Sequence, residues 1–188
     1  MASESQLNEP LSTLPEEIAM SFGTCSELKM KTESNFAILP HINKILNAAG
    51  QVTKVGIYDY VFNENIDLDS QAVVNFILKA PSNNVNPDSE RILNIVSHNL
   101  PNVQEQSAAI INEIKKAFLQ STEKHYLVFR WHTGKSAFSH VAFEERNERT
   151  RQRIRLAPAG DMFVLKSIDD GPNRGKRAMT RNFLAFDY

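Results

Sequence analysis

The spacing of hydrophobic residues divides the chain into two parts. Up to residue 122 most apolar positions recur every three to four residues, the period of a helix that buries one face. The clearest helix covers residues 104–120. Its apolar face consists of Ala108, Ile111, Ile114, Phe118 and Leu119. Proline, aspartate and serine residues at favourable end positions predict further helices over residues 14–22, 41–49, 71–80 and 87–100.

From residue 123 the hydrophobic period changes to two, which is typical of strands that bury one face. Turns that contain glycine or proline separate the alternating runs. The predicted strands are 51–62 in the first part and 125–132, 136–145, 151–158, 161–168 and 181–188 in the second. The pattern predicts an α+β fold, with a helical N-terminal half followed by an antiparallel β-meander of about four to five strands.

The length of 188 residues fits one domain. We expect residues 1–13 to form a flexible acidic tail and residues 14–188 to form a single α+β domain. Within it, residues 14–122 are helix-rich and residues 123–188 are β-rich and basic. The single cysteine allows no internal disulfide, and no apolar run approaches the ~20 residues of a membrane helix. We therefore expect a soluble cytoplasmic or otherwise intracellular protein without a membrane partner.

The net charge of -1 conceals an asymmetry between the two parts. Residues 1–110 carry 13 Asp and Glu against 6 Lys and Arg, whereas residues 111–188 carry 9 against 15. Such a division predicts either an acidic partner for the C-terminal part or self-association in which unlike ends meet. The alternative is that both parts fold together and place opposite charges side by side on one surface.

The densest basic stretch is EERNERTRQRIRLAP, residues 144–158. A strand here would project one row of guanidinium groups, which repel one another unless phosphates or carboxylates lie opposite. That row is Arg149, Arg151, Arg153 and Arg155, and the opposite face is Thr150, Gln152, Ile154 and Leu156. A helix would instead pair glutamates and arginines along a solvated surface. The apolar residues near the end of the stretch and the stop at Pro158 favour the strand.

A second basic cluster lies in GPNRGKRAMTR, residues 171–181, and Lys166 lies between the two clusters. Aromatic residues are interleaved nearby, at Trp131, Phe163 and Phe183. Arginines beside accessible aromatic side chains are typical of sites that hold phosphates and stack bases, although a core position is the commoner fate of such aromatics. The predicted nucleic-acid or anion site is Arg146, Arg149, Arg151, Arg153, Arg155, Arg174, Lys176, Arg177 and Arg181, with Trp131 as the stacking side chain.

These features predict a non-enzymatic binding or assembly protein. We found no recognisable catalytic, cofactor-binding or metal-binding motif, so we expect no enzyme activity, no cofactor and no metal. The basic β-rich part would hold an anionic partner, with RNA favoured over other nucleic acids or an acidic protein surface. Self-association is a further expectation.

A local resemblance supports an alternative function. The run AAIINEIKKAFLQSTEKHYLVFRWHTGKSAFSH, residues 108–140, resembles the second helix and the following strand of dynein light chains. The shared features are a helix that ends in a Lys-Lys-containing turn, a histidine that opens a strand, and a glycine before the next strand. The resemblance implies a dimeric protein-interaction hub that binds partner peptides at the edge of a sheet.

Overall fold

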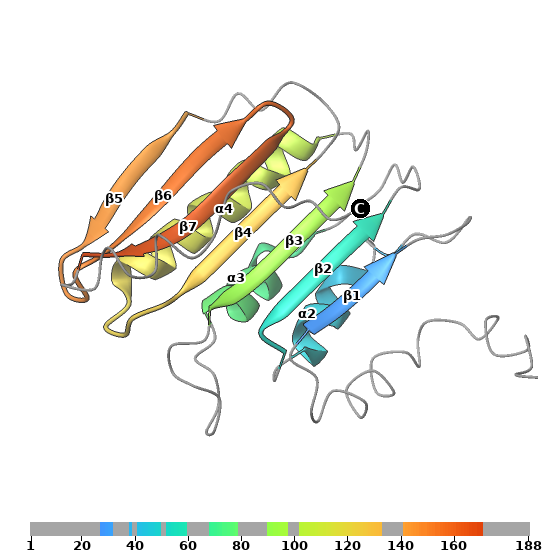
Figure 1. The fold of residues 1–188 in the computed structure, drawn as a ribbon, viewed down its shortest axis with the longest axis horizontal. Coiled ribbons are helices and arrows are strands. Elements are labelled where there is room, and N and C mark those ends of the chain that lie inside the picture. The colour runs from blue at the N-terminus through green and yellow to red at the C-terminus, as the bar shows by residue number, and fades with distance from the viewer. Residues whose placement is uncertain are drawn as a thin grey trace, which may run out of the picture.

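The computed structural model describes residues 27–31, 38, 41–49, 52–59, 68–78, 90–97, 102–132 and 141–170. These residues form one mixed sheet of seven strands covered by helices (Figure 1). The strands are β1 (Glu27–Lys31), β2 (Lys54–Asp59), β3 (Arg91–Ser97), β4 (Leu127–His132), β5 (Phe143–Asn147), β6 (Gln152–Ala159) and β7 (Met162–Asp169). The helices are α2 (Ile42–Ala48), α3 (Ser70–Leu78) and α4 (Val103–Gln120).

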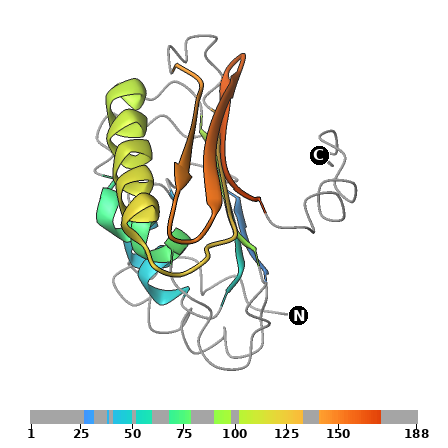
Figure 2. The ribbon, with the colours of Figure 1, turned by 90° about the vertical axis from the view of Figure 1, so that its left-hand side faces the viewer.

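The first four strands are parallel and lie in chain order, and a helix follows each of the first three. Parallel crossovers of one hand that advance in one direction place all their helices on the same face of the sheet. Figure 2 shows the three described helices on one side of the strands. The other side of the sheet carries no helix within the described residues, and we call it the helix-free face.

The last three strands extend the sheet beyond β4 by antiparallel pairing. β7 pairs with β4, β6 pairs with β7 and β5 pairs with β6, so the order across the sheet is β1-β2-β3-β4-β7-β6-β5. The fold is therefore a mixed α/β fold, in which parallel strands alternate with helices before an antiparallel end. The predicted separation of a helical half from a β-meander is corrected to this arrangement, although the antiparallel C-terminal strands were expected.

The largest correction concerns residues 87–100, which we predicted to be a helix. Residues Arg91–Ser97 form β3, which pairs with β2 on one side and with β4 on the other. Its side chains alternate strictly between buried and partly buried, with Leu93 and Ile95 facing the helices. Isoleucine and valine at 92, 95 and 96 fit a helical stripe as well as a strand, and pairing on both sides decides between them.

The remaining predicted elements agree with the structure where it describes them. The helices over 41–49, 71–80 and 104–120 and the strands over 51–62, 125–132, 151–158 and 161–168 are confirmed, with shifted ends. Only the C-terminal end of the predicted strand 136–145 can be compared, and it enters β5. The predicted tail 1–13, helix 14–22 and strand 181–188 lie outside the described residues.

One core lies between the helices and the sheet. The inward residues of the strands include Val55, Leu93, Phe129 and Phe163, each 0% exposed. The helices contribute Ile42, Val73, Ile110, Ile114 and Phe118, all at most 1% exposed. Among the described helices, none has the length and the apolar character needed to cross a membrane.

Candidate anion-binding face of the sheet

The turn before β6 interrupts the predicted row of arginines. β6 begins at Gln152, so Arg149 and Arg151 belong to the turn between β5 and β6. Of the predicted row, only Arg153 and Arg155 lie in the strand and share its helix-free face. The opposite face is as predicted, since Gln152, Ile154 and Leu156 are at most 2% exposed and Thr150 is 7% exposed. The prediction of four aligned guanidinium groups is therefore wrong.

Asn147 explains why the chain turns at this position. Its side-chain Oδ1 accepts hydrogen bonds from the backbone N–H groups of Arg149, at 2.9 Å, and Thr150, at 3.2 Å. Its Nδ2 donates to the backbone oxygens of Phe118, at 2.7 Å, and Ser121, at 2.9 Å. The turn closes with Arg151 at a φ of 57°, a left-handed conformation that costs a residue with a side chain about 1–2 kcal/mol.

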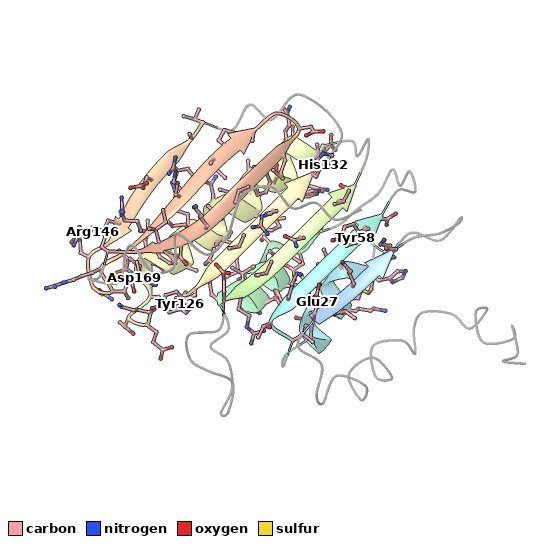
Figure 3. The ribbon with its side chains drawn as sticks, in the orientation of Figure 1. Glu27, Tyr58, Tyr126, His132, Arg146 and Asp169 are labelled. Atoms are coloured by element: carbon pink, nitrogen blue, oxygen red, sulfur yellow. The ribbon has the colours of Figure 1, made fainter. Side chains whose placement is uncertain are left out.

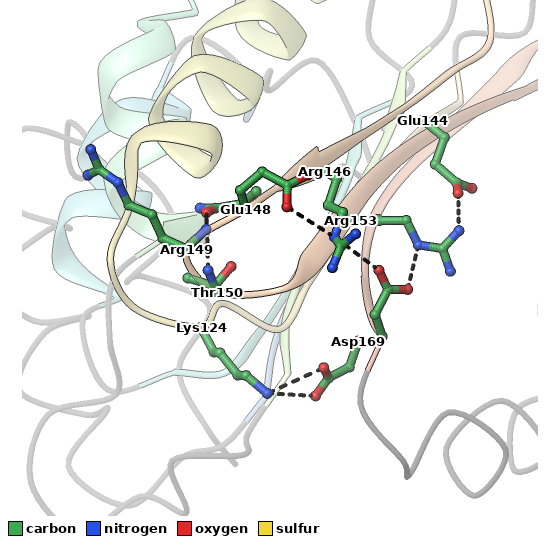
Figure 4. Close-up of polar contacts among 10 residues, drawn as sticks. Lys124, Glu144, Arg146, Glu148, Arg149, Thr150, Arg153 and Asp169 are labelled. Atoms are coloured by element: carbon green, nitrogen blue, oxygen red, sulfur yellow. Dashed lines mark hydrogen bonds and ion pairs between the residues drawn. The ribbon is translucent and has the colours of Figure 1, made fainter.

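Carboxylates neutralise two of the predicted site residues. Arg153 forms an ion pair with Glu144 through Nη1 and a 2.7 Å hydrogen bond from Nε to Oδ1 of Asp170 (Figure 4). The Nε of Arg146 lies 3.6 Å from Oδ2 of Asp170 and 3.7 Å from Oε2 of Glu148. These arginines are therefore part of a local charge network, in which carboxylates of the same chain take the place of an outside anion.

Three other cations come together on the helix-free face, and we call Arg130, Lys166 and Arg155 the cation cluster. Lys166 lies directly opposite Arg155 in the register of β7 and β6. Val128 lies opposite Lys166 in the register of β4 and β7, which places Arg130, two residues along β4, diagonally beside Lys166. Arg130, in turn, donates a 3.2 Å hydrogen bond from Nη1 to Oδ1 of Asn94 on β3.

The electrostatics of the cation cluster reflect crowding of like charges. Burial, followed by repulsion from Arg155 and Arg130, lowers the pKa of Lys166, while Glu90 acts in the opposite direction. Arg155 is exposed and forms no ion pair within the described part of the chain. Glu144, which lies opposite Arg155 in the register, is engaged by Arg153. An anion bound here would reduce the mutual repulsion of the three cations, which Glu90 offsets in part at Lys166.

A second group of cations lies at the other end of the helix-free face. It consists of Lys29 and Lys31 on β1 beside Tyr58 on β2, and we call it the lysine–tyrosine cluster. The ammonium groups lie 6.0 Å and 5.8 Å from the centre of the tyrosine ring. Alternation along β2 assigns this face, because Val55 and Ile57 point to the core and Tyr58 points away from it.

The predicted stacking residue is a core residue, so this prediction is wrong. Trp131 is 0% exposed, and its Nε1 donates a 2.8 Å hydrogen bond to Oγ of Ser97. Its ring lies 6.4 Å from those of Phe129 and Phe163, the latter edge-to-face. Phe183 and the second basic cluster of Arg174, Lys176, Arg177 and Arg181 lie outside the described residues.

Sequence reasoning missed most of the face that the structure assembles. Arg130 could have been found, because it stands between Phe129 and Trp131 in an alternating strand and must point away from their core. Lys29 and Lys31 could not, because they meet Tyr58 only through the pairing of β1 with β2. The described residues contain no group of three His, Cys, Asp or Glu that could hold a metal ion.

A separate polar pair joins the end of α4 to β4. The Oγ of Ser121 lies 2.7 Å from Nε2 of His125, and the backbone N–H of His125 donates to Oε1 of Gln152 at 2.8 Å. Burial lowers the pKa of His125, and the charge of Glu123 opposes this shift. Ser121 also accepts a 3.1 Å hydrogen bond from the N–H of Glu123, so the pair closes the turn after the helix.

The lowered pKa of His125 gives the stability a pH dependence. In the unfolded chain His125 binds a proton as the pH falls below about 6.5, whereas in the folded chain it does so only at a lower pH. Stability should therefore fall as the pH decreases through this window. His125→Gln should make stability depend less steeply on pH. Some dependence should remain in this variant, because burial also lowers the pKa of His41. Urea unfolding at several pH values measures this, and parallel curves for the two proteins would contradict it.

Comparison with known proteins does not extend these observations. No family model, no curated protein and no solved structure matches the chain. The resemblance to dynein light chains over residues 108–140 therefore rests on that local sequence alone, and the strand it contains, β4, is paired on both sides.

Proposed function

We propose that the protein is a non-enzymatic RNA-binding protein that holds single-stranded RNA on the helix-free face of its sheet. The observation that carries the proposal is the cation cluster of Arg130, Lys166 and Arg155. Three positive charges on neighbouring strands, one of them with a lowered pKa, form a surface that phosphate groups stabilise. The guanidinium groups can each hold a phosphate by two hydrogen bonds, and the lysine adds a point charge.

The shape of the surface favours a single strand. The sheet presents side chains of adjacent strands about 4.8 Å apart, so an extended backbone that crosses the strands meets a cation on several of them. Each phosphate that is neutralised releases counterions, and three contacts to single-stranded RNA give a slope of about −2 in a plot of log affinity against log salt concentration.

The described edges of the sheet give less support to the alternative, a hub that accepts partner strands. β1 and β5, the outermost described strands, are five residues long each. Lys29 and Lys31 lie on β1, and Glu144, Glu145 and Arg146 lie on β5. Short edge strands with charged side chains discourage the addition of another strand. The charged face therefore supports binding better than the edges do.

The proposal is tested by fluorescence anisotropy with a short, labelled single-stranded RNA over a salt series. Arg155→Glu/Lys166→Glu should weaken binding by about a hundredfold, because two charge-assisted contacts are lost. The exposed Arg155→Glu change alone should cost about tenfold, which preserves the test if the double variant does not fold.

The matched control is Lys116→Glu/Arg149→Glu, which makes the same change in net charge at exposed positions on α4 and its neighbouring turn. This variant should keep the affinity of the natural protein within a few-fold. An equal loss in both variants would mean that net charge alone attracts RNA. If the natural protein binds no RNA, the proposal fails and an acidic protein partner becomes the hypothesis to test.

A further inference from the structure

We infer that Tyr58 is the base-stacking side chain of the RNA site, and that the bound strand runs across the sheet from the lysine–tyrosine cluster to the cation cluster. The inference rests on the proposed function and adds a specific contact to it. It also adds a requirement for accessible bases, which a duplex and a base-free polyphosphate do not meet.

A glycine on β2 leaves space on the sheet for the tyrosine ring. Gly56 lies two residues before Tyr58 on the same face. A Cβ added at Gly56 would lie 3.0 Å from Cε2 and 3.5 Å from the hydroxyl oxygen of Tyr58. The ring therefore lies back over the glycine, along its own strand, and occupies the space that a side chain at position 56 would need. An aromatic ring held at the surface of the sheet beside cations is the kind of side chain on which single-stranded bases stack.

The neighbouring cations fit the same role. Lys29 lies opposite Gly56 and Lys31 opposite Tyr58 in the register of β1 and β2. Both ammonium groups approach the ring to within 6.0 Å, and Tyr58 is partly exposed on β2, where Figure 3 labels it. A base stacked on the ring would carry its phosphates into the reach of these lysines. Aromatic stacking combined with flanking cations is the general means of binding a single strand without sequence preference.

The surface between the two clusters contains no opposing charge on the described strands. On β3 and β4 the positions that share the helix-free face are Ile92, Asn94, Val96, Val128, Arg130 and His132. None of them is a carboxylate, and Asn94 lies between Gly56 and Arg130 in the register. A phosphate backbone that crosses these strands therefore meets amide, aliphatic, imidazole and cationic side chains. The described carboxylates nearby lie at the strand ends, where Glu90 precedes β3 and Asp161, 3.0 Å from His132, precedes β7.

The separation of the clusters sets the length of RNA required. From β2 to β7 there are three strand spacings, or about 14 Å. In the register Tyr58 is level with Met162, so Lys166 lies four residues, or about 13 Å, along the strands from it. The diagonal is about 19 Å, and at about 3.4 Å per nucleotide about six nucleotides connect Tyr58 with Lys166. Oligonucleotides shorter than this should bind weakly, because they reach only one cluster.

The inference is tested with Tyr58→Leu, Tyr58→Phe and the natural protein in the same anisotropy assay. Tyr58→Leu removes the ring and should weaken binding of single-stranded RNA about 10- to 100-fold. Tyr58→Phe keeps a stacking ring and should bind within a few-fold of the natural protein. Inorganic polyphosphate has no bases, so the natural protein and Tyr58→Leu should bind it equally, and this comparison also shows that the leucine variant retains its cationic face.

The outcomes separate this inference from the proposed function. If Tyr58→Leu binds RNA as the natural protein does while Arg155→Glu/Lys166→Glu does not, the cation cluster binds RNA and the stacking role is wrong. If duplex and single-stranded RNA bind equally well, the stacking role is also wrong. If the leucine variant loses RNA and polyphosphate alike, Tyr58 supports the sheet rather than the base, and the inference is overturned.

Discussion

Trp131→Ala should lower the free energy of unfolding by about 3–5 kcal/mol, the range for removing a large buried aromatic side chain. The indole is 0% exposed and packs beside the contacting rings of Phe129 and Phe163 beneath the centre of the sheet. Its removal leaves a cavity in a close-packed region and also leaves the Oγ of Ser97 without the hydrogen bond from Nε1. Urea-induced unfolding, followed by circular dichroism, measures the loss.

Trp131→Phe is the matched control, because it keeps an aromatic ring and removes only the hydrogen bond and part of the volume. It should cost about half as much as the alanine substitution. Because Trp131 lies on the helix side of the sheet, a folded Trp131→Phe protein should bind RNA normally. A variant with unchanged stability but lost RNA binding would contradict the core assignment and restore Trp131 as the stacking residue.

Asn147→Asp should also destabilise the protein by about 3 kcal/mol or more, because a buried carboxylate would face two carbonyl oxygens. Asn147 is 2% exposed, and its side-chain amide makes four hydrogen bonds, two from its nitrogen and two to its oxygen. The change replaces a donor with an acceptor at the end of α4, where the oxygens of Phe118 and Ser121 lie. Thermal and urea unfolding at neutral pH measure the effect.

Asn112→Asp is the control, since it introduces the same charge at an exposed position on α4. Its effect should stay within about 0.5 kcal/mol. Asn147→Ala should lie between the two aspartate variants, because it removes the hydrogen bonds without adding a charge. Equal stability of Asn147→Asp and Asn112→Asp would mean that the amide does not connect the turn to the helix as described.

The sequence predicted the elements whose periodicity is long or unambiguous. The 18 residues of α4 and the alternating strands β4, β6 and β7 were found because burial follows their pattern directly. β3 was missed because seven residues with three β-branched side chains satisfy a helical and a strand pattern equally well. Parallel pairing with β2 and β4 decides its conformation, and that information comes from distant parts of the chain.

The candidate site was predicted only in its chemistry, a basic face on the C-terminal strands. The positive φ at Arg151 broke the expected row, and the carboxylates that engage Arg153 come from a neighbouring strand and from the end of β7. Strand pairing, rather than spacing along β6, selected Lys166 and Arg130 as the neighbours of Arg155. Tyr58 is partly exposed and Trp131 is buried, which makes Tyr58 the better candidate for stacking. The type of side chain alone does not show which of the two aromatic residues lies at the surface.

The order of the strands has a consequence for folding cooperativity. Strands β1 to β4, with their helices, form one group and strands β5 to β7 form another; they join along the β4–β7 pair and where α4 contacts β5. Contiguous groups of this kind can open as separate units even when one strand pair joins them. An RNA strand laid from Tyr58 to Arg155 would bind both groups at once, so the ligand would also couple them into a single cooperative unit.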